Sequence, residues 1–110
     1  MSKKRIAVGN ISCGADELFL ISGPCVIEDE LTMMKTAEML KEVGERLKIS
    51  IIYKSSFNKD NRSSLKYYDG PGLAKGIKIL SKVKEQFGFP VLTDIHYPDQ
   101  AAPAAEVCDV

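Results

Sequence analysis

The stretch Leu18-Phe19-Leu20-Ile21-Ser22-Gly23-Pro24-Cys25 decides the fold. Its first five residues form an almost continuous apolar run, which predicts a strand that is buried on both faces, as strands of a parallel sheet are. Gly23 and Pro24 end this strand, and Cys25 follows directly. A doubly wound sheet that binds a nucleotide would carry a glycine fingerprint here, and this turn does not match one.

Downstream of this strand, helical and extended patterns alternate. After the acidic start Glu28-Asp29-Glu30, apolar residues recur every three or four positions through residues 31–47, which predicts a helix. Gly88 stands where a helix-ending glycine belongs after a second such pattern. The further predicted elements are a strand at 49–53, a helix at 73–87, a strand at 90–93, a short helix at 100–105 and the first half of a fourth strand at 107–110.

This order predicts an α/β fold with parallel strands and right-handed crossovers. A doubly wound sheet and a (β/α)8 barrel both fit, and the missing glycine fingerprint favours the barrel. A barrel needs about 250 residues, so we expect residues 18–110 to hold the first three to four βα units of a truncated barrel. Residues 1–17 are expected to form an N-terminal strand or hairpin segment, with 5–8 pairing to 18–22 through the turn-rich stretch 10–16.

Composition narrows the class of protein. Lys plus Arg and Asp plus Glu are equal at 15 each, which argues against a nucleic-acid binder. The sequence has no apolar run of membrane-spanning length, and the basic start is not followed by an unbroken apolar segment, so neither a membrane partner nor a signal peptide is expected. Three cysteines without motif spacing fit reduced thiols in the cytoplasm.

Polar side chains follow each of the three complete predicted strands. Cys25 follows the first strand, Lys54 and Lys59 follow the second, and Asp94 and His96 follow the third. Because the carboxyl ends of barrel strands converge on one rim, these groups are expected to share a pocket.

The loop 54–64 is the richest of these segments. Lys54, Lys59 and Arg62 offer two ammonium groups and one guanidinium fork, and neighbouring residues such as Asn61 and Ser63 add amide and hydroxyl groups. Such a set suits the phosphate and carboxylate groups of a small substrate. A solvated surface loop is the alternative, and composition alone does not exclude it.

Cys25 and His96 each have a second interpretation. A free cysteine is usually a small buried hydrophobe, whereas a thiolate metal ligand would need partners from elsewhere in the fold. His96 is the only histidine, and a lone histidine more often makes structural hydrogen bonds. Asp94 projects from the same strand face two residues earlier, which favours a joint polar role.

Residues 21–28 resemble the Gly-Pro-Cys element of the phosphoenolpyruvate-dependent 3-deoxy-sugar-acid synthases. The loop Lys54-Ser55-Ser56-Phe57-Asn58-Lys59-Asp60-Asn61-Arg62-Ser63-Ser64 is similar to the specific Asn-Arg-Ser-Ser motif of the 3-deoxy-D-manno-octulosonate 8-phosphate synthases within that family. Residues 70–73 and 93–96 match the same enzymes in order and spacing, so the resemblance runs from about Leu18 to Val110. The sister heptulosonate 7-phosphate synthases typically carry Lys-Pro-Arg-Thr in place of this motif.

The resemblance implies that phosphoenolpyruvate and D-arabinose 5-phosphate condense with water to give the octulosonate 8-phosphate and phosphate, a step of lipopolysaccharide (Kdo) synthesis. Lys54 and Lys59 would hold the phosphoenolpyruvate anion, and Asp94 and His96 would act near the reacting carbons. The residues implied for the sugar phosphate and neighbouring hydroxyls are Asn61, Arg62 and Ser63.

The resemblance also implies a divalent metal and a tetramer. Metal-dependent members carry Cys where metal-independent members carry Asn, so Cys25 predicts a zinc, iron or manganese ligand. The family's other ligands are expected beyond Val110. One departure is Tyr97, which stands beside His96 where several relatives have Glu.

Two alternatives remain open at this point. The first is the sister heptulosonate 7-phosphate synthase, which uses erythrose 4-phosphate. The second is a non-catalytic remnant, because an open half-barrel leaves strand edges unpaired and inner faces uncovered. On that ground this chain by itself is expected to be marginally folded and to show no turnover.

Overall fold

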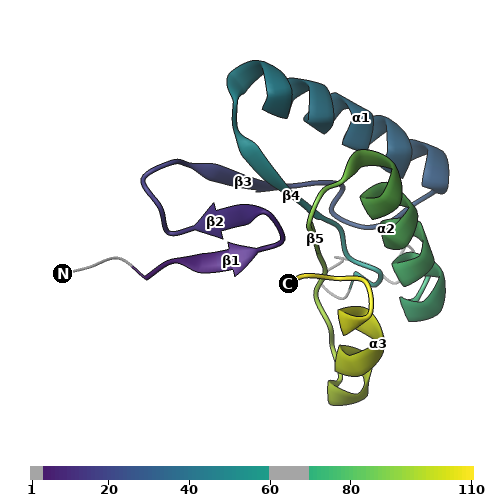
Figure 1. Ribbon diagram of the computed structural model, residues 1–110. Helices are drawn as coiled ribbons and strands as arrows, with labels where there is room; N and C mark the ends of the chain where they lie inside the picture. Colours follow the sequence, from purple (N-terminus) through teal and green to yellow (C-terminus); the bar gives the residue numbers. More distant parts are fainter. Residues whose placement is uncertain (1–3, 60–69) are drawn as a thin grey trace.

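The computed structural model describes residues 4–59 and 70–110 and shows an α/β arrangement of two small sheets and two long helices (Figure 1). The strands are β1 (Ile6–Val8), β2 (Ile11–Cys13), β3 (Phe19–Ser22), β4 (Ser50–Lys54) and β5 (Val91–Leu92). The helices are α1 (Glu30–Leu47), α2 (Leu73–Phe87), the 3-10 turn η1 (Pro98–Gln100) and α3 (Ala101–Ala105). No helix among these residues is long and apolar enough to cross a membrane.

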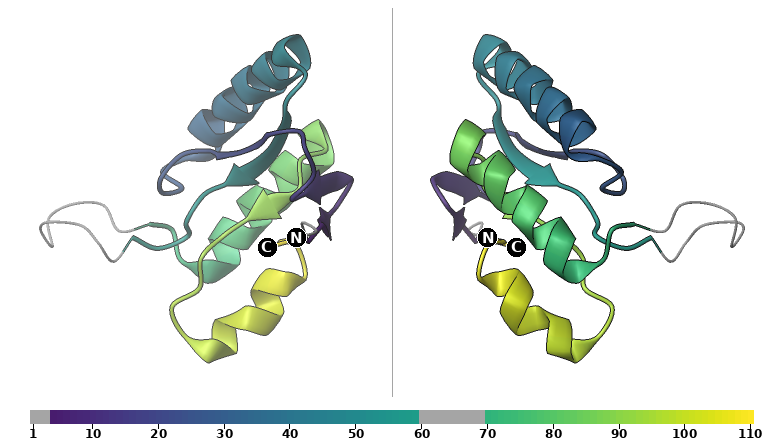
Figure 2. Two further views of the ribbon diagram at one scale, coloured as in Figure 1. Left: turned by 90° about the vertical axis from the view of Figure 1, so that its left-hand side faces the viewer. Right: turned by 90° about the vertical axis from the view of Figure 1, so that its right-hand side faces the viewer.

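The larger sheet is parallel, as the alternating pattern predicts. Its strand order is β3-β4-β5, with Leu20 paired to Ile51 and Tyr53 paired to Val91. The crossover helices α1 and α2 lie side by side and pack against this sheet (Figure 2). The prediction of parallel strands joined by helical crossovers is therefore confirmed.

Local sequence signals set the ends of both long helices. The carboxylate of Asp29 accepts a hydrogen bond from the Thr32 main-chain N–H at 2.7 Å, which caps the start of α1. Helix α2 ends at Phe87 and is followed by Gly88, whose φ of 75° is left-handed and whose N–H donates to the carbonyl oxygen of Lys84. Both helices match their predicted ranges to within one residue.

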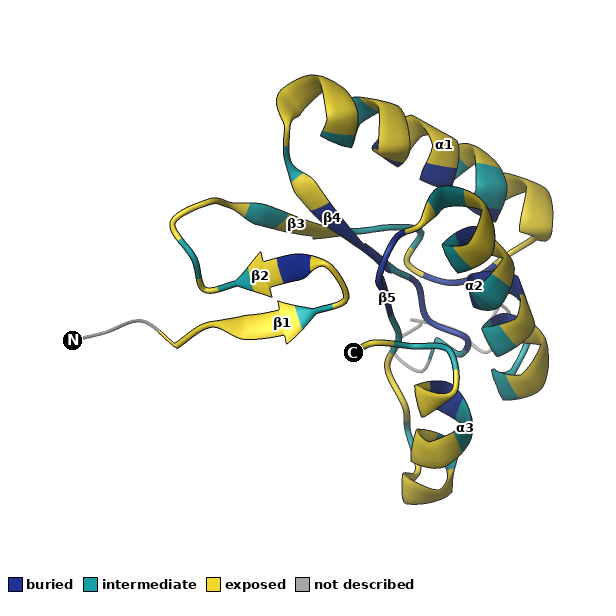
Figure 3. Ribbon diagram, in the orientation of Figure 1, coloured by how far each residue is buried: buried dark blue, intermediate teal, exposed yellow. Residues whose placement is uncertain are grey.

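The core lies between the two helices and the sheet, and burial is concentrated on β4, β5 and the inner sides of α1 and α2 (Figure 3). Tyr53 of β4 is fully buried at its centre, and its hydroxyl donates to the main-chain oxygen of Met33 at 2.9 Å. Burial raises the pKa of Tyr53, so the phenol stays neutral and keeps its donor. Other members of this core include Ile27, Ala37, Leu80, Val83 and Val91.

The prediction that the first strand is buried on both faces is wrong. Leu20 is 41% exposed and Ile21 is 48% exposed, and they point to opposite faces of β3. In the part of the chain that is described, β3 is the edge strand of the larger sheet and no other element fully covers either of its faces.

The N-terminal hairpin forms, but not with the predicted partner. β1 pairs antiparallel with β2, so that Ile6 lies opposite Cys13 and Val8 lies opposite Ile11. The two-residue turn between them, Gly9-Asn10, has Gly9 at a φ of 57°, which suits the first position of a tight hairpin turn. This short closure replaces the predicted pairing of 5–8 with 18–22.

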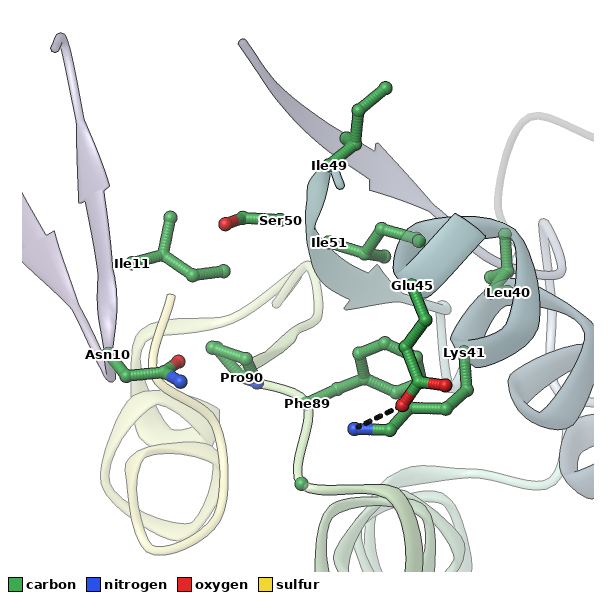
Figure 4. A pocket seen from close by; sticks show the side chains of 12 residues that line it. Asn10, Ile11, Leu40, Lys41, Glu45, Ile49, Ser50, Ile51, Phe89 and Pro90 are labelled. Atoms are coloured by element: carbon green, nitrogen blue, oxygen red, sulfur yellow. Dashed lines mark ion pairs between the residues drawn. The ribbon is translucent and has the colours of Figure 1, made fainter. Parts of the chain in front are cut away.

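The hairpin packs against the amino-terminal ends of β4 and β5. Figure 4 shows Asn10 and Ile11 of the hairpin facing Ser50, Ile51 and Pro90 across a pocket of about 170 Å³. Ile11 is buried there. The hairpin therefore covers the end of the larger sheet that is opposite to the strand ends discussed below.

Of the predicted fourth strand, only the first main-chain hydrogen bonds to β5 are present. Residues 107–110 form no regular strand, but Val110 accepts a hydrogen bond from the Thr93 N–H and donates one to the oxygen of Val91, the pattern of a parallel neighbour. The ammonium group of Lys84 bonds the Asp109 carboxylate at 3.0 Å and fixes this segment beside β5.

Gly23 allows the turn after β3 to lie directly against β4. A Cβ atom at Gly23 would lie 1.9 Å from the main-chain oxygen of Lys54, a distance that real side chains never show. Only glycine fits this close approach, which brings the carboxyl ends of the two strands together.

Gly23→Ala is expected to lower the free energy of unfolding by about 3 kcal/mol or more, the upper end for overpacking, because the methyl group would meet main-chain atoms. Urea denaturation followed by circular dichroism measures this change. Gly88→Ala is the matched control: its Cβ would meet nothing within 4 Å, so only the left-handed φ costs energy, about 1 to 2 kcal/mol. A loss at Gly23 no larger than that at Gly88 would contradict the steric argument.

Candidate active site

The loops that follow β3, β4 and β5 meet around one pocket of about 220 Å³ at the carboxyl ends of the strands. The residues that line it are Cys25, Lys54, Ser56, Asn58, Lys59, Asp94 and His96. All five described residues that the sequence predicts for a site are in this set. The structure therefore brings together groups that lie up to 71 positions apart, between Cys25 and His96.

Main-chain hydrogen bonds hold the three loops in place. The N–H of Ser55 donates to the main-chain oxygen of Leu92 at 3.2 Å, and the N–H of Ser56 donates to the main-chain oxygen of Cys25 at 3.3 Å. The buried hydroxyl of Ser55 adds a bond of 2.6 Å to the oxygen of Pro24. The end of β4 is thus joined to both of its neighbours, and the side chains that follow the strands share one rim.

Four side chains form a connected polar chain across the pocket. The ammonium group of Lys54 donates to the hydroxyl of Ser56 at 3.2 Å, and that hydroxyl donates to Oδ1 of Asp94. Oδ2 of Asp94 lies 3.2 Å from Nε2 of His96. The imidazole ring of His96 stacks on Phe57, with ring centroids 6.0 Å apart.

The pKa of Asp94 is lowered in this setting. Partial burial opposes ionisation, but hydrogen bonds from Ser56 and His96, together with the charge of Lys54, outweigh it and favour the carboxylate. The pocket therefore holds a negative carboxylate whose charge is shared with a hydroxyl group and an imidazole.

Lys54 and Lys59 line the same small pocket. Two neighbouring cations with amide and hydroxyl donors nearby form a site that suits a small anion with phosphate or carboxylate groups. Lys54 and Lys59 lie on a pocket beside an Asp–His pair, whereas residues 60–64 of the same loop lie outside the described residues, so the solvated-loop alternative stays open for that part.

Cys25 is an exposed thiol at this pocket, so the alternative interpretation as a small buried hydrophobe is wrong for it. Among residues 4–59 and 70–110, no group of three His, Cys, Asp or Glu side chains could hold a metal ion. The side chains around Cys25 therefore do not by themselves fit a divalent cation, and the metal prediction gains no support from the described geometry.

Two residues that line the pocket, Ser56 and Asn58, were not predicted from the sequence, and three predicted residues lie outside the described ones. Ser56, which is buried and bonded to both Lys54 and Asp94, was not singled out. The available signal was its position two residues after Lys54, which places both on one face of an extended segment. The predicted sugar-phosphate residues Asn61, Arg62 and Ser63 lie outside the described residues.

Comparison with known proteins identifies relatives along nearly the whole chain. A family model described as the DAHP synthetase I family matches residues 2–110. Proteins named 2-dehydro-3-deoxyphosphooctonate aldolase from Geotalea uraniireducens and Geotalea daltonii are 51% and 50% identical over 108 residues, which is 97% of this chain and 40% of each relative. The protein of that name from Albidiferax ferrireducens is 56% identical over 93 residues, 84% of this chain and 33% of its own length.

Asp94→Asn is expected to flatten the dependence of stability on pH. An unfolded Asp has a pKa of about 3.9, and the pKa of Asp94 in the folded chain is lower. The carboxylate therefore stabilises the fold fully above about pH 4 and loses this effect as the pH falls through the folded pKa. The difference in unfolding free energy from Asp94→Asn should therefore be largest near neutral pH and shrink in acid. Because the side chain is 47% exposed, we expect at most about 1 kcal/mol.

Urea denaturation at a series of pH values measures this difference. Asp99→Asn, which removes a charge from an exposed residue of η1 outside the pocket, is the control for a general change in net charge. A difference between the unmodified chain and Asp94→Asn that grows as the pH falls below 4 would contradict the assignment.

Proposed function

Because this chain belongs to the DAHP synthetase I family, we propose that the protein condenses phosphoenolpyruvate with D-arabinose 5-phosphate and water. The products would be 3-deoxy-D-manno-octulosonate 8-phosphate, a precursor for lipopolysaccharide, and inorganic phosphate. The chain spans about 40% of the length of the first relatives it matches, so the activity of the whole protein is part of this proposal. The observation that carries it is the pocket that joins two lysines to the Asp94–His96 pair.

We also propose a barrel architecture for the whole protein. Residues 18–110 would be the first three to four βα units of a (β/α)8 barrel, preceded by the hairpin segment 1–17. The parallel order β3-β4-β5, the pairing of Val110 beside β5 and the polar groups at the carboxyl ends of the strands support this arrangement. The hairpin would then close the amino-terminal end of the barrel.

Lys54 and Lys59 would hold the phosphate and carboxylate groups of phosphoenolpyruvate. Two substrates that both carry phosphate repel each other, and fixed cations offset this repulsion while orienting the reacting carbons. The methylene carbon of phosphoenolpyruvate forms a bond to the aldehyde carbon, whose oxygen takes up a proton. Water adds to the former enol carbon with loss of a proton, and phosphate then leaves from the resulting hemiketal as its carbon–oxygen bond breaks.

Asp94 and His96 would line the site near the reacting carbons. Nε2 of the imidazole lies 3.2 Å from the Asp94 carboxylate, so the pair would present an oriented imidazole and a carboxylate to the reacting atoms. The proposed contacts to the sugar phosphate and its neighbouring hydroxyls are Asn61, Arg62 and Ser63, on the strength of the sequence motif alone.

A divalent cation, zinc, iron or manganese, with Cys25 as one ligand, remains a proposal that rests on the family resemblance. Such an ion would supply polarisation of water or of the aldehyde. No step above is assigned to it, since the described side chains do not complete a site. A cytoplasmic homotetramer is proposed on the same resemblance.

The second candidate is the heptulosonate 7-phosphate synthase reaction, in which erythrose 4-phosphate replaces arabinose 5-phosphate. The description of the matching family model favours it, whereas the names of the relatives at about 50% identity favour the octulosonate enzyme. The two candidates share the phosphoenolpyruvate site and differ in the sugar phosphate.

Lys54→Gln and Lys59→Gln are each expected to weaken phosphoenolpyruvate binding by about 10- to 100-fold, since each removes a charge-assisted hydrogen bond. Isothermal titration calorimetry on the full chain measures the affinity. Lys78→Gln removes an exposed charge from α2, outside the pocket, and should leave the affinity unchanged. Equal losses for all three variants would show that only the general charge matters.

A second titration separates the two sugar phosphates. With phosphoenolpyruvate present, we expect arabinose 5-phosphate to bind at least 10-fold more tightly than erythrose 4-phosphate. We expect Arg62→Ala to abolish this difference. Tighter binding of erythrose 4-phosphate would favour the heptulosonate reaction. Absence of phosphoenolpyruvate binding by the folded chain would contradict both candidates.

A further inference from the structure

Ser56 occupies the centre of the polar chain in the candidate active site. The residue is 6% exposed, and its hydroxyl group contacts Lys54 on one side and Asp94 on the other. Its main chain is equally constrained: the N–H donates to Cys25 and the oxygen accepts from the Ile27 N–H at 3.0 Å. Ser56 is therefore held in one position in this pocket, both by its main chain and by its hydroxyl group.

We propose that Ser56 is a positioning residue of this site: its hydroxyl group joins the ammonium group of Lys54 to the carboxylate of Asp94 and thereby holds Asp94 against His96. The catalytic meaning of this role rests on the proposed function. Ser56 touches Lys54 and Asp94 in the structure, and its effect on His96 passes through Asp94.

The chemistry of a hydroxyl group explains why serine suits this position. A hydroxyl donates one hydrogen bond and accepts others, so it can accept from an ammonium group and donate to a carboxylate at the same time. The carboxylate of Asp94 is half-exposed, and without this donor it would be free to turn toward water. Oδ1 is held by Ser56, and this leaves Oδ2 directed at the imidazole of His96.

Other titratable groups surround Asp94 in the pocket. The titratable groups that line the pocket with it are Cys25, Lys54, Lys59 and His96. Hydrogen bonding by Ser56 is one of the influences that hold the pKa of Asp94 low, against the opposing effect of burial. Loss of the Ser56 hydroxyl should therefore move that pKa upward while leaving the four neighbouring groups in place.

The experiment is an NMR titration of the Asp94 carboxyl carbon in the full chain and in three variants. Ser56→Ala should raise the midpoint, and Ser56→Thr, which keeps the hydroxyl group, should restore it. Ser55→Ala is the matched control, because Ser55 is buried and hydrogen-bonded through its hydroxyl to Pro24 but does not line the pocket. Its midpoint should equal that of the unmodified chain.

The contact between Asp94 and His96 gives a second, purely geometric readout. His96 is the only histidine, so its ring signals are unambiguous. The nuclear Overhauser effect between this ring and the Asp94 side chain should be lost in Ser56→Ala and kept in the other two variants. Where Ser56→Ala does not fold, Ser56→Cys carries the test, because a thiol is close in size and only a weak donor.

An unchanged midpoint and contact in Ser56→Ala, or equal changes in Ser55→Ala, would overturn the proposal. Neither readout needs a substrate. A chain that shows the Ser56 effect but binds no phosphoenolpyruvate would disprove the proposed function alone, and a chain that binds phosphoenolpyruvate without the Ser56 effect would disprove the positioning role alone.

Discussion

The close approach between the carboxyl ends of β3 and β4 is the constraint on which the rest of the site depends. Gly23 has no side chain, and its backbone lies where a Cβ atom would collide with the main-chain oxygen of Lys54. Main-chain hydrogen bonds from Ser55 and Ser56 then join the end of β4 to Leu92 and Cys25. The three loops are thereby held next to one another, and their polar side chains share one rim.

Electrostatics gives this rim its chemical character. The chain as a whole is neutral, with 15 basic and 15 acidic residues, so the pocket is not the product of a general charge excess. Lys54 and Asp94 have opposite charges and are joined through one hydroxyl group, that of Ser56. In a half-buried pocket such interactions are stronger than in water, and they hold each group in an orientation that a solvated loop would not maintain.

The helices were predictable because their signals are local. Capping by Asp29, the apolar period of 31–47 and the glycine at 88 act within one or two turns of chain, so tertiary packing did not need to override them. The strand partners were less predictable. The apolar run 18–22 was expected to be buried and to pair with 5–8, but the two-residue turn at Gly9-Asn10 closes a nearer hairpin at a lower entropic cost. β3 is then left at the edge of the sheet.

The sequence by itself determined the alternation of strands and helices, the glycine turn after the first strand, and the residue types that follow each strand. It therefore indicated Cys25, Lys54 and His96 as candidates for one pocket. Only the tertiary structure decided which side chains touch. The bond from Ser56 to Asp94 spans 38 residues of sequence and the bond from Ser55 to Pro24 spans 31. Such contacts form only when packed helices and paired strands bring distant segments together, because no local preference of the chain encodes a distance between them.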